Sequence, residues 1–496
     1  MAYLLGLDLG TSSAKAMVVD EYGNCISGAN KEYGVESPAD GYAEQNGETL
    51  WNALTDCIQK ALHGANISGT QISGVGLSGQ MHGLALIDQN KTLLRPIIIW
   101  LDKRSGRQVA ALEKIADTSA SGNRFSTGFF LPSLLWVREM EPDVYARTRY
   151  ALLPKDYIRL RLCGEIGTDV SDASGTLLFD QARDGWDIAL AEKLGIDPDI
   201  LPQCHFAWEI AGRITPQAAA ATGLTAGTPV VYGGSDSSMQ LVGSGCVKAG
   251  NVNTNIGTGS QFAVICDKPL IDGRLNAFRH SVPGKWSNMV ASLNGGCVLK
   301  WLRDGLFPGV GSYGQMDALA ESIPSGSGGV VFLPYINGER SPDLDANARG
   351  IFFGLRPEHG QAHFIRAAME SVIFTFRRGR DIFLSEKFPL DQTIIASGGG
   401  ANSSFWLQMQ ADILQSQIVT NRNKEEACLG AAIMAGIGCG IYADAEQGSS
   451  AAVQRSPLVY VPSSAAVQAL DQSYQLFCAL YEKNRELFAL DNMGFS

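Results

Sequence analysis

A short stretch near the start of the chain returns in its second half, and this repeat limits the folds that the chain can adopt. DLGTSSAKAMVVD (residues 8–20) aligns without gaps to NIGTGSQFAVICD (residues 255–267), with Gly, Thr, Ser, Ala and Asp at the same offsets. In each copy, apolar strand-like runs flank a polar Gly-Thr turn, which is the pattern of a β-hairpin. Two such hairpins, one opening each half of the chain, predict a duplicated fold of two similar domains that face each other.

The length and the periodicity of the chain agree with this prediction. At 496 residues, the chain exceeds what one hydrophobic core usually supports. Strand-like segments alternate with amphipathic helical segments, the clearest of which are residues 49–62, 362–376 and 464–490, so we expect an α/β protein. We expect the two domains to comprise residues 1–245 and 246–496.

The overall charge and the cysteines limit the partners and the location of the protein. A net charge of -11 argues against a nucleic-acid-binding surface. No apolar run is long enough to cross a bilayer, and the N-terminal residues do not have the pattern of a signal peptide. The ten cysteines are scattered, which is typical of free thiols in a reducing compartment. We therefore expect a cytoplasmic protein without nucleic-acid or membrane partners.

The repeated Gly-Thr turns suggest a binding site for an oligophosphate. A single turn of this kind could be only a tight bend, with Asp8 as a solvated loop acid. Two similar turns on opposite sides of a cleft can present backbone N–H groups and hydroxyls to the same phosphate chain. Asp8 lies at a strand end beside the first turn. It is therefore placed to hold Mg²⁺, which takes one or two protein carboxylates and keeps several waters.

Two segments that contain strands carry polar residues suited to an acceptor site. In LSGQMHGLALID, Gln80, Met81 and His82 lie between two glycines, which lets a substrate approach the backbone closely. The simpler interpretation is a strand bulge with an exposed histidine. In PIIIWLDKR, Asp102 follows a buried strand, where sites of α/β proteins usually form, although it could instead cap the next helix.

Two later segments join a strand to a helix. In YGGSDSSMQLVGSG, Asp236 stands at the helix start, where it could be an N-cap or a general base. Phosphoryl transfer needs mainly alignment and charge stabilisation, plus one residue that accepts the hydroxyl proton. In TIIASGGGANSSFW, a triple glycine precedes a helix capped by Asn402 or Ser403, and such a turn lets a flat ligand lie on the backbone.

Together these segments make the chain similar to the FGGY family of carbohydrate kinases, within the actin–hexokinase–Hsp70 superfamily. The resemblance covers almost the whole chain in family order, through LDLGTSSAKA, GYAEQ, SGQMHG, LRPIIIWLDKR, LLPKDYIRLRL, GGSD, GTGS, FLPYINGERSP, GIFFGLRPEHGQAHFIRAAME and SGGGANSSFW. It implies two RNase H-like domains around a central cleft. It also implies phosphorylation of a sugar or polyol hydroxyl with ATP and Mg²⁺. Homodimers occur in the family, which leaves a homodimer open for this chain.

The resemblance also implies roles for individual residues. Asp236 corresponds to the catalytic base, and Asp8 to a catalytic carboxylate associated with the metal. The implied acceptor-binding residues are Met81 and His82, with Gln80 and Asp102 beside them. The implied nucleotide-binding residues are Thr11, Ser12, Lys15, Thr258, Gly259, Gly296, Gly399 and Asn402.

Three positions depart from the family pattern: Leu101, Ser133 and Ser235. None of them is Asp236 or belongs to either Gly-Thr turn. They therefore affect which acceptor we expect the protein to use, but not the expectation that it is a kinase. The motifs most resemble those of members that phosphorylate xylulose, so we expect conversion of D-xylulose to D-xylulose 5-phosphate. Ribulose, gluconate, glycerol and a tetritol are the alternative acceptors. An ATP-binding regulator of the same fold, without sugar-dependent activity, is the alternative from another class.

Overall fold

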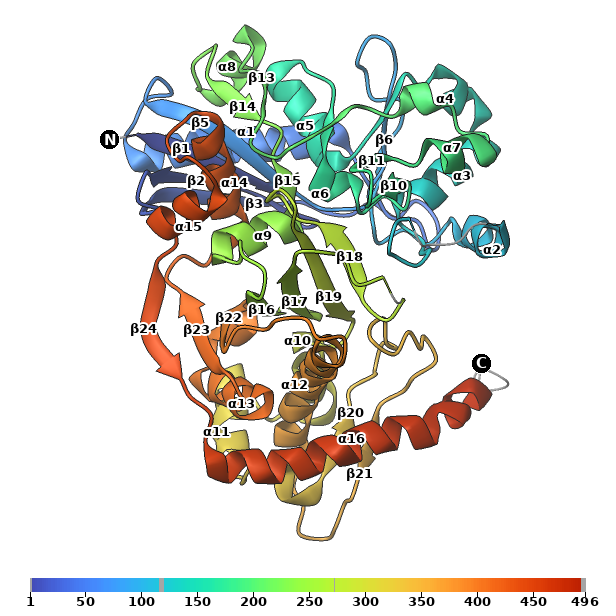
Figure 1. The fold of residues 1–496 in the computed structure, drawn as a ribbon, viewed down its shortest axis with the longest axis vertical. Coiled ribbons are helices and arrows are strands. Elements are labelled where there is room, and N and C mark those ends of the chain that lie inside the picture. Colours follow the sequence, from blue (N-terminus) through green and yellow to red (C-terminus); the bar gives the residue numbers. More distant parts are fainter. Residues whose placement is uncertain (1, 116–119, 272, 492–496) are drawn as a thin grey trace.

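The computed structural model describes residues 2–115, 120–271 and 273–491, which form two lobes, one above the other in Figure 1. The first lobe contains a mixed sheet. Along this sheet the strands are β13 (Ile210–Arg213), β14 (Pro229–Val231), β5 (Ile72–Gly79), β1 (Tyr3–Leu9), β2 (Ser13–Asp20) and β3 (Cys25–Glu32), and the short β15 (Gly234–Ser235) also pairs with β5. β1 is antiparallel to β2 and parallel to β5.

The second lobe repeats this arrangement. Its strands are, in spatial order, β18 (Asn276–Arg279), β19 (Trp286–Ser292), β17 (Ser260–Cys266), β16 (Val252–Ile256), β22 (Thr393–Ser397), β23 (Gln417–Asn421) and β24 (Arg455–Tyr460). β16 is antiparallel to β17 and parallel to β22, as β1 is to β2 and β5. The two copies of the repeated sequence therefore form equivalent hairpins, and the predicted duplication is present in the sheets.

Helices cover both faces of the first sheet. They include α1 (Gly47–Ala65), α5 (Pro154–Cys163), α9 (Asp236–Ser244), α14 (Glu426–Gly438) and α15 (Ala445–Ala452). Alternate residues of β1 face different helices, because Leu5 and Leu7 pack with α1 whereas Leu4 packs with α14. Gly6 lies on the α14 face, where an added Cβ would stand 1.8 Å from a carbonyl oxygen of that helix. The glycine therefore lets α14 approach the sheet closely.

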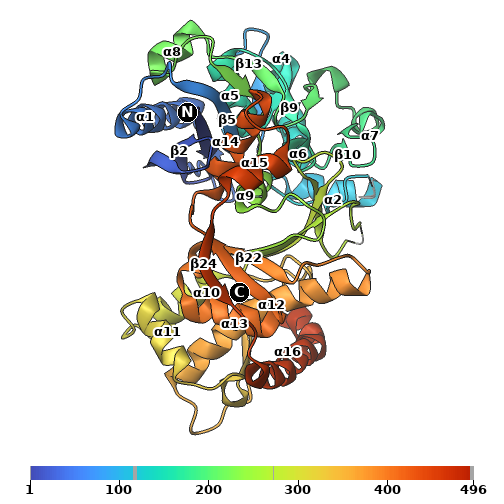
Figure 2. The same ribbon diagram turned by 60° about the vertical axis from the view of Figure 1, so that its left-hand side comes forward.

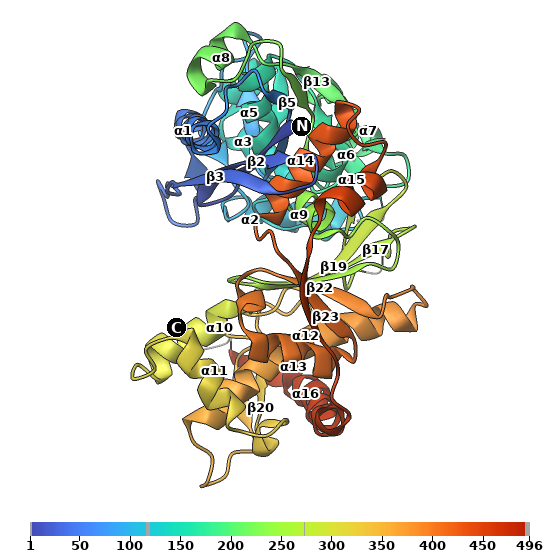
Figure 3. The ribbon, with the colours of Figure 1, turned by 90° about the vertical axis from the view of Figure 1, so that its left-hand side faces the viewer.

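The chain crosses between the lobes more than once. After β23 it returns to the first lobe, where it forms α14 and α15, and it then enters the second lobe again as β24 (Figure 2). α9 and α14 cross at the junction of the lobes, which Figure 3 shows from the side. The division of the chain at residues 245 and 246 stays a prediction. In the sequence, the strands of the first sheet all precede this division and the strands of the second sheet all follow it. α14 and α15 follow the division in the sequence but pack on the first lobe.

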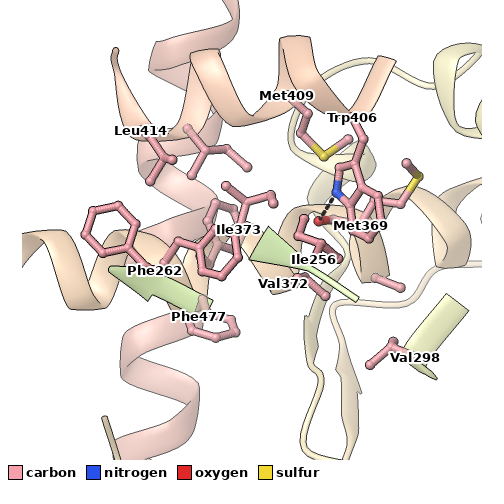
Figure 4. Packing of buried hydrophobic residues seen from close by; sticks show 14 of the residues in the cluster. Ile256, Phe262, Val298, Met369, Val372, Ile373, Trp406, Met409, Leu414 and Phe477 are labelled. Carbon is pink, nitrogen blue, oxygen red and sulfur yellow. Dashed lines mark hydrogen bonds between the residues drawn. The ribbon is translucent and has the colours of Figure 1, made fainter. Parts of the chain in front are cut away.

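The second lobe has its own apolar core (Figure 4). Around it lie α10 (Gly296–Trp301), α11 (Tyr313–Glu321), α12 (Gln361–Ser385), α13 (Ser404–Leu414) and α16 (Ser464–Asp491). The helices predicted from periodicity appear as α1, α12 and α16. Ser403 caps α13 by accepting a hydrogen bond from the Trp406 N–H, and the Trp406 indole donates to the Met369 carbonyl at 3.1 Å. This packing fixes the strand-to-helix turn that precedes α13.

The ten cysteines are all free thiols, as the sequence predicts. Among the described residues, no helix has both the length and the apolar character that a membrane span requires.

Candidate active site

The first Gly-Thr turn lies at the end of the β1–β2 hairpin. Asp8 on β1 stands opposite Lys15 on β2 and Ser78 on β5. The Ser78 hydroxyl donates to Asp8 Oδ1 at 2.7 Å, and burial raises the pKa of the Asp8 carboxyl. Lys15 Nζ pairs with Glu425, just before α14, at 2.6 Å. A carboxylate and a lysine thus lie beside the turn, on the face of the sheet that α14 covers.

Three side chains hold this turn in place through a chain of hydrogen bonds. The Trp100 indole N–H donates to Thr11 Oγ1 at 2.8 Å, and the Gln45 amide donates to the Thr11 carbonyl at 2.6 Å. Gln80 in turn donates to Gln45 Oε1 at 2.7 Å. Gln80 is fully buried, so in this structure it supports the first turn and does not line the cavity described next.

A cavity of about 520 Å³ lies between the lobes. Its walls include Thr11, Met81, His82, Trp100, Phe129 and Asp236 from the first lobe, and Gln261, Asn276, Phe278, Glu339 and Arg340 from the second. The structure therefore brings the first turn, the predicted acceptor pair and the predicted base to one cavity. We call it the acceptor cavity.

His82 is held in one orientation. Its backbone has a positive φ of 73°, and its ring stacks on Phe129 with centroids 3.8 Å apart. Nδ1 lies 2.7 Å from the Gly175 carbonyl oxygen. Because a carbonyl only accepts hydrogen bonds, Nδ1 carries the proton and Nε2 is left as an acceptor. Burial lowers the pKa of His82 to about 4, so the ring is neutral at pH 7.

Asp236 is the first residue of α9 but does not cap it, because Ser235 accepts the capping hydrogen bond from the Ser238 N–H. Asp236 Oδ1 accepts from the Ser237 N–H at 2.6 Å. Burial, together with the negative charge of Asp8, raises the pKa of Asp236 to about 7. A carboxylate with a pKa in this range can accept a proton and release it near neutral pH.

A second cavity, of about 540 Å³, lies in the second lobe. Its walls include the predicted nucleotide residues Thr258, Gly296, Gly399 and Asn402, together with Tyr313 and Trp406. We call it the glycine-lined cavity. Thr258 lines it, whereas Gln261, three residues further along the hairpin, lines the acceptor cavity. The second Gly-Thr turn therefore lies between the two cavities.

Other predicted residues lie elsewhere. Asp102 does not line the acceptor cavity, because its buried carboxylate accepts from the Ala43 N–H at 2.7 Å and pairs with Arg104 at 2.8 Å. Ser12 is exposed on the first turn, and Gly259 belongs to the second turn without lining either cavity.

The three departures from the family pattern differ in position. Ser235 lies next to Asp236, whereas Leu101 is exposed and Ser133 is buried within α3 (Phe130–Met140).

Sequence reasoning missed several residues of the acceptor cavity, among them Phe129, Asn276 and Arg340. Phe129 and Asn276 lie outside the segments singled out for their chemistry. Arg340 belongs to FLPYINGERSP, which contributed to the family resemblance but suggested no role. The charged pair Glu339-Arg340 between a glycine and a Ser-Pro step was the available signal.

Comparison with known proteins agrees with this arrangement. Family models described as the N-terminal and C-terminal domains of the FGGY family of carbohydrate kinases match residues 3–243 and 252–439. The chain therefore belongs to the FGGY family, and it is a sugar kinase.

The individual proteins to which the chain is similar are also sugar kinases. The chain is 33% identical over 492 residues to the xylulose kinase of Bacillus subtilis, covering 98% of both chains. It is 30% identical to the gluconokinase of B. subtilis over 459 residues, covering 89% of this chain and 88% of that one. A crystal structure of a xylulose kinase from Brucella ovis superposes with a TM-score of 0.90 at 34% identity, covering 98% of this chain and all of that one. The predicted two-domain α/β fold is thus confirmed.

Proposed function

We propose that this protein transfers the γ-phosphoryl group of ATP to a ketose, with D-xylulose as acceptor and D-xylulose 5-phosphate as product. The observation that carries the proposal is the acceptor cavity, which Asp236, His82 and the first Gly-Thr turn line together. Similarity to xylulose kinases over almost the whole chain supports the choice of acceptor. The free thiols support a cytoplasmic location.

The nucleotide would bind across the two cavities. Gly296 and Gly399 line the glycine-lined cavity, and without side chains there the adenosine would lie against the backbone. Thr258 lines the same cavity, so the phosphates would extend from it toward the first turn. There Thr11, Ser12 and Lys15 would contact them through hydroxyl, backbone and ammonium groups.

The residues present also fit a magnesium ion. Asp8 is a single carboxylate with one side-chain hydrogen bond, from Ser78, and Mg²⁺ in nucleotide sites uses one or two carboxylates together with phosphates and waters. When bound, the ion would neutralise charge on the phosphates. No cluster of three or more metal-ligating side chains occurs among the described residues, so Asp8 is the residue that we propose to hold it.

The reaction then requires two tasks of the protein. Asp236 accepts the proton of the acceptor hydroxyl as its oxygen attacks the γ-phosphorus, and His82 Nε2 accepts a hydrogen bond from another hydroxyl of the sugar, which fixes its orientation. Because the cavity has walls from both lobes, their approach would exclude water, which would otherwise compete as the phosphoryl acceptor.

Measurement of ADP release with a panel of acceptors tests the proposal. We expect the highest kcat/KM with D-xylulose, compared with D-ribulose, D-gluconate, glycerol and erythritol. Gluconate is the main alternative, because the gluconokinase relative covers most of the chain. A clear preference for another acceptor would overturn the assignment of xylulose. ATP hydrolysis that no sugar stimulates would instead favour a regulator of the same fold.

A further inference from the structure

Arg340 is a charged residue of the acceptor cavity to which the proposed mechanism gives no task. It follows β20 (Val331–Leu333) in the second lobe, and it lines the cavity together with His82 and Asp236. Burial is the main cause of the lowered pKa of His82, and the positive charge of Arg340 lowers it further. Arg340 and His82 therefore line the same cavity, in which the sugar would bind.

The charge of Arg340 is poorly compensated by the protein. Among the ion pairs formed by residues 2–115, 120–271 and 273–491, none includes Arg340. The adjacent Glu339 carboxylate accepts from the Ser292 hydroxyl and from the Arg340 backbone N–H, each at 2.7 Å. Burial raises the pKa of Glu339 to about 7, so near pH 7 it is only partly ionised. A half-buried guanidinium without a fully ionised partner is stabilised by a ligand that supplies hydrogen-bond acceptors.

The hydrogen-bonding character of the two side chains defines the ligand that fits. A guanidinium has only donors, whereas Nε2 of His82 in its neutral form only accepts. A ketone oxygen is purely an acceptor and matches Arg340, and a hydroxyl on the neighbouring carbon can donate to His82. If an alcohol replaced the ketone, its O–H hydrogen would need an acceptor that the guanidinium does not provide.

We propose that Arg340 selects the acceptor by donating hydrogen bonds to the ketone oxygen at C2, so that the enzyme prefers a ketose to the corresponding polyol. This inference rests on the proposed function, in which Asp236 faces the C5 hydroxyl at the other end of the same sugar. Arg340 is thereby a specificity-determining residue contributed by the second lobe. The preference for ketoses then requires residues of both lobes to contact the same sugar.

The test compares D-xylulose with D-arabinitol, in which an alcohol replaces the ketone at the carbon that is C2 in xylulose (C4 in arabinitol) and the other carbons are unchanged. We would measure kcat and KM for both acceptors, and KM for ATP, in the wild type, Arg340→Met and Arg356→Met. Arg356 is an exposed arginine of the same lobe and serves as the matched control. A hydrogen bond from a charged group contributes enough for a change of about tenfold to a hundredfold.

We expect Arg340→Met to lower kcat/KM for D-xylulose by that factor, mainly through KM, and to change D-arabinitol and ATP little. The ketose-to-polyol ratio then falls, and Arg340→Lys restores part of it. A ratio that stays at the wild-type value in Arg340→Met, or equal losses for both acceptors, overturns the inference. A wild type that ignores D-xylulose while phosphorylating another acceptor overturns the proposed function instead, so the two failures are distinguishable. An unfolding temperature for each variant shows whether it is folded.

Discussion

Replacing Asp236 by Asn should stabilise the folded protein at alkaline pH while removing the proposed base. Burial and the charge of Asp8 raise the pKa of Asp236 from 3.8 to about 7, a difference of about three pK units. At about 1.4 kcal/mol for each unit, ionised Asp236 would destabilise the fold by at most about 4 kcal/mol. Asp236 is partly exposed to the acceptor cavity, and solvent there reduces the destabilisation. We therefore expect the free energy of unfolding of the variant at pH 8 to exceed that of the wild type by about 1 to 3 kcal/mol.

The sign of the effect depends on pH in a defined way. A carboxyl whose pKa is raised in the folded state binds its proton more tightly there, so the folded state loses stability as pH rises from about 4 to about 7. The stabilisation by Asp236→Asn should therefore be absent near pH 4, grow up to about pH 7 and then stay constant. Thermal unfolding of both proteins across this range measures it.

A matched control is Asp304→Asn, because Arg303 and Lys300 hold the pKa of that exposed carboxyl down, at about 2. This variant should show no alkaline stabilisation. An Asp236→Asn protein that is no more stable than the wild type at pH 8, or equally stabilised at every pH, would refute the reasoning.

Two further substitutions test the placement of the site. In Gly175→Ala, the new Cβ would stand 2.8 Å from Met81 Cε and 3.0 Å from His82 Nδ1. KM for the sugar should therefore rise at least about tenfold while KM for ATP stays near normal. A rise in KM for ATP alone would contradict the placement of the sugar beside Met81 and His82. Asp8→Asn should raise the Mg²⁺ concentration that gives half-maximal activity by about tenfold or more, with the unfolding temperature retained. A magnesium dependence identical to that of the wild type would argue against Asp8 as the metal-associated carboxylate.

Short sequence patterns predicted the features of this protein that neighbouring residues determine, such as the hairpins and single site residues. The repeated Gly-Thr hairpin indicated two similar domains, because equivalent turns between equivalent strands require equivalent sheets. His82 and Asp236 could be located because glycines and a strand-to-helix step surround them. Their shared cavity, however, depends on how the lobes meet.

Features that depend on distant contacts could not be predicted in the same way. α14 is apolar around its whole circumference, since it is buried both by the first sheet and by α9, and such a helix shows no amphipathic direction. Asp102 follows a strand as a site residue would, but inside the protein its charge is neutralised by Arg104 and its carboxylate also accepts a hydrogen bond from the Ala43 N–H. Arg340 reaches the acceptor cavity from the other lobe, which no periodicity reveals.

The rate of phosphoryl transfer in a single turnover tests the central claim most directly. ATP, Mg²⁺ and D-xylulose are mixed with an excess of enzyme, and formation of the sugar phosphate is followed for the wild type and Asp236→Asn. We predict that the variant binds both substrates with near-normal affinity and transfers the phosphoryl group about 10²- to 10⁴-fold more slowly. Transfer at the wild-type rate by a variant free of wild-type enzyme would contradict the claim that Asp236 accepts the proton.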